Sequence, residues 1–157
     1  MGSVILHLGC ADDIRPGCIN MDPAIDGWRF EDGLPMFPDE SVDGITISHA
    51  IQNVELKDRI AVFKEFHRVL RKDGVLRITD DDTESLDSPR FNQPVWFHGR
   101  QVSPTGPYQV FRTMKEAGFR FSMVMKATTT LFPTDQLIIA HREHKVPRYV
   151  FYVEGQK

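Results

Sequence analysis

Apolar residues occur along the chain in short runs. Val4–Leu8 and Cys18–Met21 are apolar runs that end at Gly9 and Asp22, Trp28–Glu31 is a mixed run, and Asp43–Ser48 is rich in β-branched residues. Continuous apolar runs of this length are typical of strands buried on both faces of a parallel sheet. We therefore predict four strands in the first third of the chain.

Residues 55–74 have a different pattern, with apolar side chains every three or four positions, which is the spacing of a helix. Arg71 and Lys72 favour the last helical turn, and Gly74 can take the left-handed position that ends a helix. We predict a helix through Lys72. Its apolar positions are Leu56, Ile60, Phe63, Phe66, Val69 and Leu70.

The second half of the chain continues the alternation of strands and helices, which is typical of an α/β fold with a mostly parallel sheet. Residues 133–144 fit either element, and Pro133 and Asp135 favour a helix. The predicted elements are strands at Val75–Thr79, Phe119–Met125 and Arg148–Gly155, and a helix from Tyr108 to Ala117 that stops at Gly118.

Two connections between the first strands are unusually short. Nine residues separate Leu8 from Cys18, and six separate Met21 from Trp28. Parallel strands are normally joined by about a dozen or more residues, most often a helix. We therefore expect that two helices are missing and that one sheet face lacks cover there. A dimer partner or the segment Asp80–Pro107 would fill the gap.

Composition limits the possible classes of protein. The chain has 157 residues, a net charge of −3 and only two cysteines, Cys10 and Cys18. We expect one domain over 1–157, with no disulfide framework, no strong nucleic-acid signal and no membrane segment. The N-terminus lacks a basic region and a long apolar core, so we expect a reduced, cytoplasmic protein without a signal peptide.

Four features follow predicted strands, and ligands of open α/β sheets bind at the carboxyl ends of strands. Gly9 allows close approach of a ligand, and the carboxylate of Asp22 suits a ribose diol. Asp32 can accept from an exocyclic amine, beside backbone groups and an apolar wall at Gly33 and Leu34. His49 follows the fourth strand, where a cofactor would meet its substrate.

These stretches resemble a known family. The motifs LHLGCADDIRPGCINMD (6–22), LPMFPDESVDGITISHAIQNV (34–54) and EFHRVLRKDGVLRIT (65–79) are similar to those of class I S-adenosylmethionine-dependent methyltransferases, in particular a small type-11-like branch with a shortened front loop. The resemblance implies a reduced Rossmann-like methyltransferase fold with an antiparallel final strand. It also implies contacts to S-adenosylmethionine from His7, Gly9, Cys10, Ala11, Asp22, Asp32, Gly33, Leu34, Ser48, His49 and Ala50.

The same stretches also depart from the family pattern. The family signature H-x-L-E-H is replaced by His49-Ala50-Ile51-Gln52-Asn53, so its glutamate and second histidine are absent. The resemblance implies methyl transfer to a small-molecule acceptor. A reduced fold that serves as a cofactor-binding or protein-interaction module is the alternative. An NAD-type oxidoreductase is disfavoured, because no G-x-G-x-x-G precedes a helix.

A general base is optional for methyl transfer, and His49 is the best candidate, followed by His98. We expect no metal: three adjacent aspartates, Asp80–Asp82, cannot all face one point, and His141 and His144 have no third ligand nearby. Residues 88–107 are rich in proline and aromatic residues, which indicates either a substrate lid or a packing loop.

Overall fold

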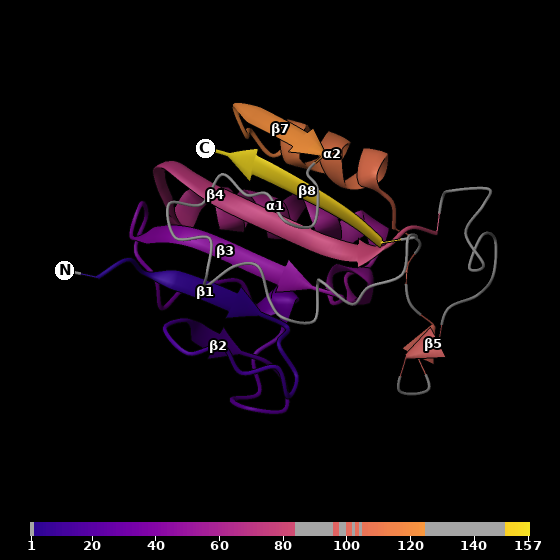
Figure 1. The fold of residues 1–157 in the computed structure, drawn as a ribbon, viewed down its shortest axis with the longest axis horizontal. Coiled ribbons are helices and arrows are strands. Elements are labelled where there is room, and N and C mark those ends of the chain that lie inside the picture. Colours follow the sequence, from indigo (N-terminus) through magenta and orange to yellow (C-terminus); the bar gives the residue numbers. More distant parts are fainter. Residues whose placement is uncertain (1, 84–95, 98–99, 102, 104, 125–149) are drawn as a thin grey trace.

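A six-stranded sheet with the order β2-β1-β3-β4-β8-β7 forms the centre of the molecule (Figure 1). The computed structural model describes residues 2–83, 96–97, 100–101, 103, 105–124 and 150–157. Strands β2, β1, β3 and β4 are parallel, and β8 is antiparallel to both of its neighbours. The predicted α/β fold with an antiparallel final strand is thereby confirmed. The strands are β1 (Ile5–Leu8), β2 (Ile19–Met21), β3 (Val42–Ser48), β4 (Leu70–Asp81), β7 (Phe121–Val124) and β8 (Val150–Gln156).

Two helices, α1 (Leu56–Val69) and α2 (Pro107–Glu116), pack on one face of this sheet and against each other (Figure 1). The main apolar core lies between them and the sheet, with Phe63, Phe66 and Met114 fully or almost fully buried. The smaller elements are the 3-10 turns η1 (Phe30–Asp32) and η2 (Ile51–Asn53) and a two-stranded sheet of β5 (Trp96–Phe97) and β6 (Arg100–Gln101).

The short front connections contain no α-helix, as predicted from their length. A loop alone joins β1 to β2, and only η1 lies between β2 and β3. The predicted strand at Trp28–Glu31 is wrong, because Phe30–Asp32 forms a 3-10 turn. The Asp32 carboxylate accepts from the Arg29 backbone N–H at 2.9 Å, and the indole N–H of Trp28 donates to the Gly33 carbonyl at 2.7 Å. These bonds curl the segment, which has no neighbouring strand to pair with.

Helix α1 ends at Val69, three residues before the predicted end. Leu70 is fully buried and already belongs to β4, where it pairs with Val42 of β3. The strand therefore begins where the last helical turn was expected. The register shifts between Val42 and Gly44, and the left-handed residue is Asp73, at φ 64°, rather than Gly74. Burial of Leu70 in the sheet outweighs the basic last turn that the sequence suggested.

The other predicted elements of the second half are confirmed where the structure describes them. Strand β4 contains Val75–Thr79, and helix α2 is followed by Gly118 at φ 104°. The predicted helix at 133–144, with His141 and His144, and most of the loop 88–107, with His98, lie outside the described residues.

A row of polar residues crosses the sheet on the face opposite the helices. Successive register partners are Asn20, His7, Thr46, Arg77 and Glu154. The last four of these are 0% exposed. The side chain of Arg15 is also buried, and its guanidinium donates to the Thr46 hydroxyl at 3.4 Å. Because polar groups lose hydration on burial, this row requires partners within the fold.

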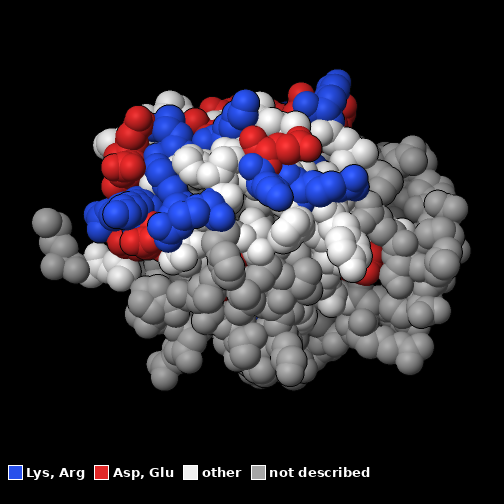
Figure 2. Space-filling model, turned by 90° about the horizontal axis from the view of Figure 1, so that it is seen from above, with Lys and Arg blue, Asp and Glu red and all other residues white. Residues whose placement is uncertain are grey.

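In the described part of the face seen in Figure 2, lysine and arginine lie beside aspartate and glutamate. Arg120 and Asp73, both exposed, form an ion pair at 2.7 Å. Among the described residues, no helix is long and apolar enough to cross a membrane.

Candidate functional site

A cleft of about 680 Å³ opens at the carboxyl ends of β1 and β3. Seven residues predicted to contact a cofactor lie in its lining, on the loop after β1 and on the turn after β3. The predicted ones are His7, Gly9, Cys10, Ala11, Ser48, His49 and Ala50, and the cleft is also lined by Asp12, Asp13, Ala24, Ile25 and Asn53.

Gly9 turns the chain out of β1 at φ 66° and donates its backbone N–H to the Met21 carbonyl at 2.8 Å. A Cβ at this position would lie 2.6 Å from the Cβ of Ala50 and 3.1 Å from the Phe30 ring. Protein packing therefore requires glycine here, in addition to the ligand approach that the sequence suggested. The side chain of its neighbour Cys10 is buried, which raises the pKa of the thiol to about 11 and keeps it protonated.

We expect Gly9→Ala to lower the free energy of unfolding by at least about 2 kcal/mol, because it adds left-handed strain and a contact too short for two carbons. Gly27→Ala is the matched control, since Gly27 has φ 78° but a Cβ there would meet nothing within 4 Å. That variant should lose only about 1 kcal/mol. Urea unfolding of both variants measures the difference, and equal losses would show that packing against Ala50 is unimportant.

Asp22 follows β2, and its carboxylate organises the cleft wall. One oxygen accepts from the backbone N–H of Ala11 and the other from that of Ala24, both at 2.9 Å. Ala11 and Ala24 both line the cleft. Each carboxylate oxygen can accept a second hydrogen bond, so Asp22 can hold the loop and still bind a hydroxyl pair.

His49 follows β3 in a strained conformation, at φ 53°. Its backbone N–H donates to the Thr79 carbonyl at 2.7 Å, which joins the end of β3 to β4. Left-handed backbone at a residue other than glycine costs energy and is concentrated at functional sites. The strain here turns the chain so that Ser48, His49 and Ala50 all line the cleft.

Two aspartates at the end of β4 lie next to His49. Asp81 has a carboxylate oxygen 3.9 Å from the His49 Nδ1. Asp80 is fully buried, and its two oxygens accept from the backbone N–H groups of Asp81, at 2.8 Å, and Gln52, at 3.2 Å. One atom of each of the three side chains lies within 4.8 Å of the others. Such clusters are common without an ion, and we assign no metal to this one.

Burial shifts the pKa values of Asp80 and His7 in opposite directions. It raises the pKa of the Asp80 carboxyl from 3.8 to about 7, so the folded protein holds a proton that the unfolded chain releases. It lowers the pKa of His7 from 6.5 to about 4, with the charge of Arg15 as the second cause. Between about pH 4 and pH 6.5 the folded protein therefore keeps His7 neutral, while the unfolded chain protonates it.

The contribution of Asp80 to the free energy of unfolding should therefore fall as the pH rises from about 4 towards 7. The contribution of His7 should rise between about pH 4 and 6.5. Each slope can reach about 1.4 kcal/mol per pH unit. We expect the two slopes to offset each other in the wild-type chain. Asp80→Asn should unmask a stability that rises with pH, and His7→Asn one that falls. Urea unfolding between about pH 4.5 and 6.5 measures these slopes; identical slopes in all three proteins would contradict the assignment.

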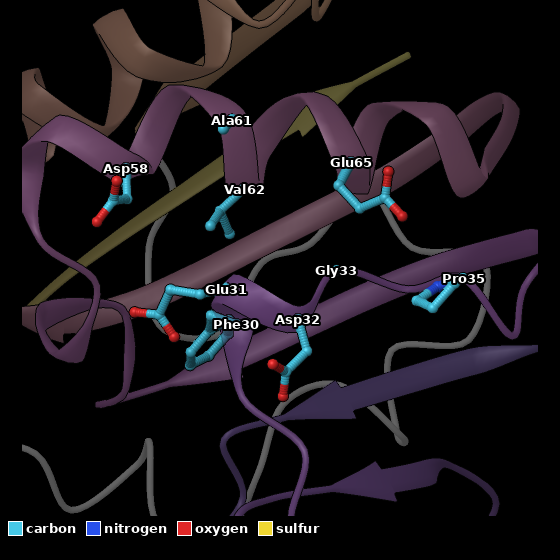
Figure 3. Close-up of a pocket in the computed structure, with 9 residues that line it drawn as sticks. All are labelled: Phe30, Glu31, Asp32, Gly33, Pro35, Asp58, Ala61, Val62 and Glu65. Carbon is cyan, nitrogen blue, oxygen red and sulfur yellow. The ribbon is translucent and has the colours of Figure 1, made fainter.

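The four remaining predicted contacts, Asp22, Asp32, Gly33 and Leu34, are not among the residues that line this cleft, although Asp22 bonds to two that do. Asp32 and Gly33 line a second hollow of about 530 Å³ between η1 and α1, together with Asp58 and Glu65 (Figure 3). Leu34 is a fully buried core residue. Their adenine role stays a prediction.

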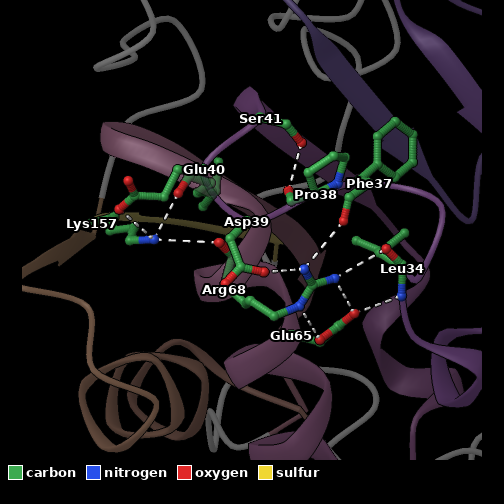
Figure 4. A network of polar contacts seen from close by, with 10 residues as sticks. Leu34, Phe37, Pro38, Asp39, Glu40, Ser41, Glu65, Arg68 and Lys157 are labelled. Carbon is green, nitrogen blue, oxygen red and sulfur yellow. Dashed lines mark hydrogen bonds and ion pairs between the residues drawn. The ribbon is translucent and has the colours of Figure 1, made fainter.

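Arg68 connects the segment that contains Leu34 to α1. Its guanidinium donates to Glu65 through two nitrogens, at 2.7 and 2.9 Å, and to the carbonyls of Leu34 and Phe37 at 3.1 and 3.2 Å (Figure 4). It also pairs with Asp39 at 2.5 Å. This Arg68 clamp holds the segment 34–39 to α1.

The comparisons with known proteins agree with this geometry. Residues 28–78 match the family model described as a methyltransferase domain. The match covers 51 of the 157 residues, from Trp28 before η1 to Ile78 in β4. Comparison with curated proteins gives no match.

Solved structures with a similar fold are described as S-adenosylmethionine-dependent enzymes or as methyltransferases. A possible histamine N-methyltransferase from Thermotoga maritima has a TM-score of 0.68 at 18% identity, covering 100% of this chain and 83% of its own. An Archaeoglobus fulgidus methyltransferase has a TM-score of 0.63 at 14% identity, covering 99% and 86%. A Haloferax volcanii methyltransferase in complex with the Trm112 activator has 0.66 at 18%, covering 99% and 82%.

Sequence reasoning missed five residues of the cleft: Asp12, Asp13, Ala24, Ile25 and Asn53. Four of them lie within three residues of Gly9, Cys10 or Asp22 in the chain, so proximity to the motif was the available signal. Asn53 is reached because η2 turns the chain back after β3.

Proposed function

We propose that this domain binds S-adenosylmethionine in the cleft and transfers its methyl group to a small-molecule acceptor. The methyltransferase-domain match and the fold indicate this cofactor. The observation that carries the proposal is the convergence of the Gly9 loop and His49 on one cleft at the carboxyl ends of the strands, where the Asp22 carboxylate bonds to the lining residues Ala11 and Ala24.

The chemistry of the lining fits this ligand. The cleft volume lies within the range of about 300–1,000 Å³ that small-molecule sites occupy. Asp22 retains acceptor capacity for the ribose hydroxyls, and the loop after β1 has no helix N-terminus. A dinucleotide would need that helix end for its pyrophosphate, whereas S-adenosylmethionine has no phosphate.

When bound, S-adenosylmethionine supplies an electrophilic methyl carbon, and attack by the acceptor breaks the carbon–sulfur bond, with the electron pair remaining on sulfur. The chain places the acceptor and excludes water. His49 lines the cleft and is the side chain that we assign to take the acceptor's proton. Because the methyl carbon is already reactive, the base refines the rate rather than creating the reaction.

Titration calorimetry with S-adenosylmethionine, S-adenosylhomocysteine and NAD tests the proposal. We expect the first two to bind and NAD to give no heat. Binding of NAD alone would favour a nucleotide oxidoreductase instead. Small amines are the first acceptors to assay, since one structural neighbour is described as a possible histamine N-methyltransferase.

A second candidate is a cofactor-binding or protein-interaction module without turnover. The observation that favours it is the replacement of the family's H-x-L-E-H by a sequence with Gln52 and Asn53 at its end. One structural neighbour was solved in complex with the Trm112 activator. A methyl-transfer assay of the wild type separates the two candidates: an enzyme should transfer the methyl group at a rate that His49→Ala lowers, whereas a module should bind the cofactor without turnover. A homodimer and a cytoplasmic location stay predictions.

A further inference from the structure

We infer that Asp81 is a positioning residue that holds the His49 imidazole with Nδ1 protonated and Nε2 as the proton acceptor. This inference rests on the proposed function of the cleft. It adds a second residue to the site, one that the sequence analysis left among three undifferentiated aspartates.

The side chains meet at the rim of the cleft. The carboxylate oxygen of Asp81 lies 3.9 Å from the Nδ1 of His49, and the two side chains are 22% and 37% exposed. This is ion-pair distance, about 1 Å longer than a hydrogen bond. Catalytic hydrogen bonds are often long in the absence of ligands and shorten in the substrate complex. A small side-chain rotation therefore suffices to form the bond.

The neighbouring carboxylate has a different role. Asp80 is fully buried, and both of its oxygens accept backbone N–H groups, from Asp81 and Gln52. Asp80 thereby fixes the backbone on each side of the pair, at the end of β4 and at η2. The Asp80 carboxyl therefore has a structural role, and the carboxylate next to the His49 Nδ1 is that of Asp81.

Backbone geometry holds the pair in place. The His49 backbone N–H donates to the Thr79 carbonyl at 2.7 Å, which ties the end of β3 to β4 at a position two residues before Asp81. Asp81 itself pairs with Val150 of β8, so its main chain is held on the other side as well. Strain at His49, at φ 53°, is maintained by this surrounding structure.

The pair has a definite chemical consequence. An imidazole whose Nδ1–H donates to a carboxylate presents the lone pair of Nε2 for proton abstraction. The acceptor's nitrogen or oxygen uses an electron pair to form the new bond to the methyl carbon, and the acceptor's N–H or O–H proton moves to Nε2. The resulting imidazolium is stabilised by the nearby Asp81 side chain, and the proton leaves to water after transfer.

Nitrogen NMR of the full chain tests the inference without an acceptor. At about pH 8.5, where imidazoles are neutral, two-bond and three-bond couplings identify which ring nitrogen of His49 carries the proton. We expect Nδ1–H in the wild type and a shift to Nε2–H in Asp81→Asn. Asp82→Asn removes the same charge one residue later and should leave the tautomer unchanged. The same tautomer in the wild type and Asp81→Asn would overturn the inference.

A conservative variant keeps the test decisive if Asp81→Asn does not fold. Asp81→Glu retains a carboxylate and should retain Nδ1–H, whereas Asp81→Ser removes it and should give Nε2–H. Circular dichroism of each variant verifies the fold. If Glu and Ser give one and the same tautomer, the carboxylate does not set it.

Turnover distinguishes failure of the inference from failure of the proposed function. With an acceptor identified by the amine assay, Asp81→Asn should lower kcat about tenfold to a hundredfold with little change in KM, and should have no further effect in a His49→Ala background. If the tautomer responds to Asp81 but His49→Ala leaves kcat unchanged, the base role fails and the positioning stands. Additive losses in the double variant would overturn action through His49.

Discussion

Asp22→Ala is expected to weaken S-adenosylmethionine binding about a hundredfold or more. A hydrogen bond to a charged group contributes about 1.5–3 kcal/mol, and the ribose can form two with this carboxylate. The variant also removes the acceptors for the backbone N–H groups of Ala11 and Ala24, which line the cleft. Titration calorimetry measures the dissociation constant directly.

Two further variants make this result interpretable. Asp58→Ala removes a carboxylate from the second hollow, between η1 and α1, and should leave the affinity unchanged. Asp22→Asn keeps one acceptor oxygen and should fall between the wild type and Asp22→Ala. An affinity for Asp22→Ala within about threefold of the wild type would show that the ribose is bound elsewhere.

Glu154→Gln is expected to lower the free energy of unfolding by about 3–5 kcal/mol, the largest stability effect that we predict. Glu154 and Arg77 form an ion pair at 2.9 Å, and both side chains are fully buried. The guanidinium also lies 5.1 Å from the centre of the Tyr152 ring. Removing the carboxylate charge leaves the cation of Arg77 buried without its opposite charge. A domain with about 5–15 kcal/mol of total stability would be strongly affected.

Urea unfolding of three proteins tests this prediction. The double variant Arg77→Met with Glu154→Leu should recover most of the loss, because well-packed apolar residues can replace a buried pair. Asp73→Asn breaks the exposed pair with Arg120 and should cause little change, since surface ion pairs contribute little. If Glu154→Gln is as stable as Asp73→Asn, the buried pair does not stabilise the face of the sheet opposite α1 and α2.

Much of the fold could be predicted because the apolar runs of β1 and β3 and the periodicity of α1 are local signals. The end of α1 could not be predicted, since the burial of Leu70 against β3 depends on a strand that is distant in sequence. The turn at Phe30 was missed for a different reason: local hydrogen bonds of Asp32 and Trp28 curl a segment whose residue types favour a strand.

The candidate site shows the same division. Gly9, Asp22 and His49 follow predicted strands, and the carboxyl ends of parallel strands share one edge, so their proximity could be inferred. The partition of Asp80 and Asp81 could not, because one carboxylate is buried under η2 and the next lies at the cleft rim. Alternation of side chains along a strand places neighbours on opposite faces, but it does not say which face meets a loop.

The Arg68 clamp also has a consequence for the cleft. The clamp holds residues 34–39 to α1, and this segment leads into β3, whose last residue, Ser48, lines the cleft. Loss of the clamp would therefore loosen the strand that leads to His49. Ligand binding would weaken although no residue that lines the cleft had changed.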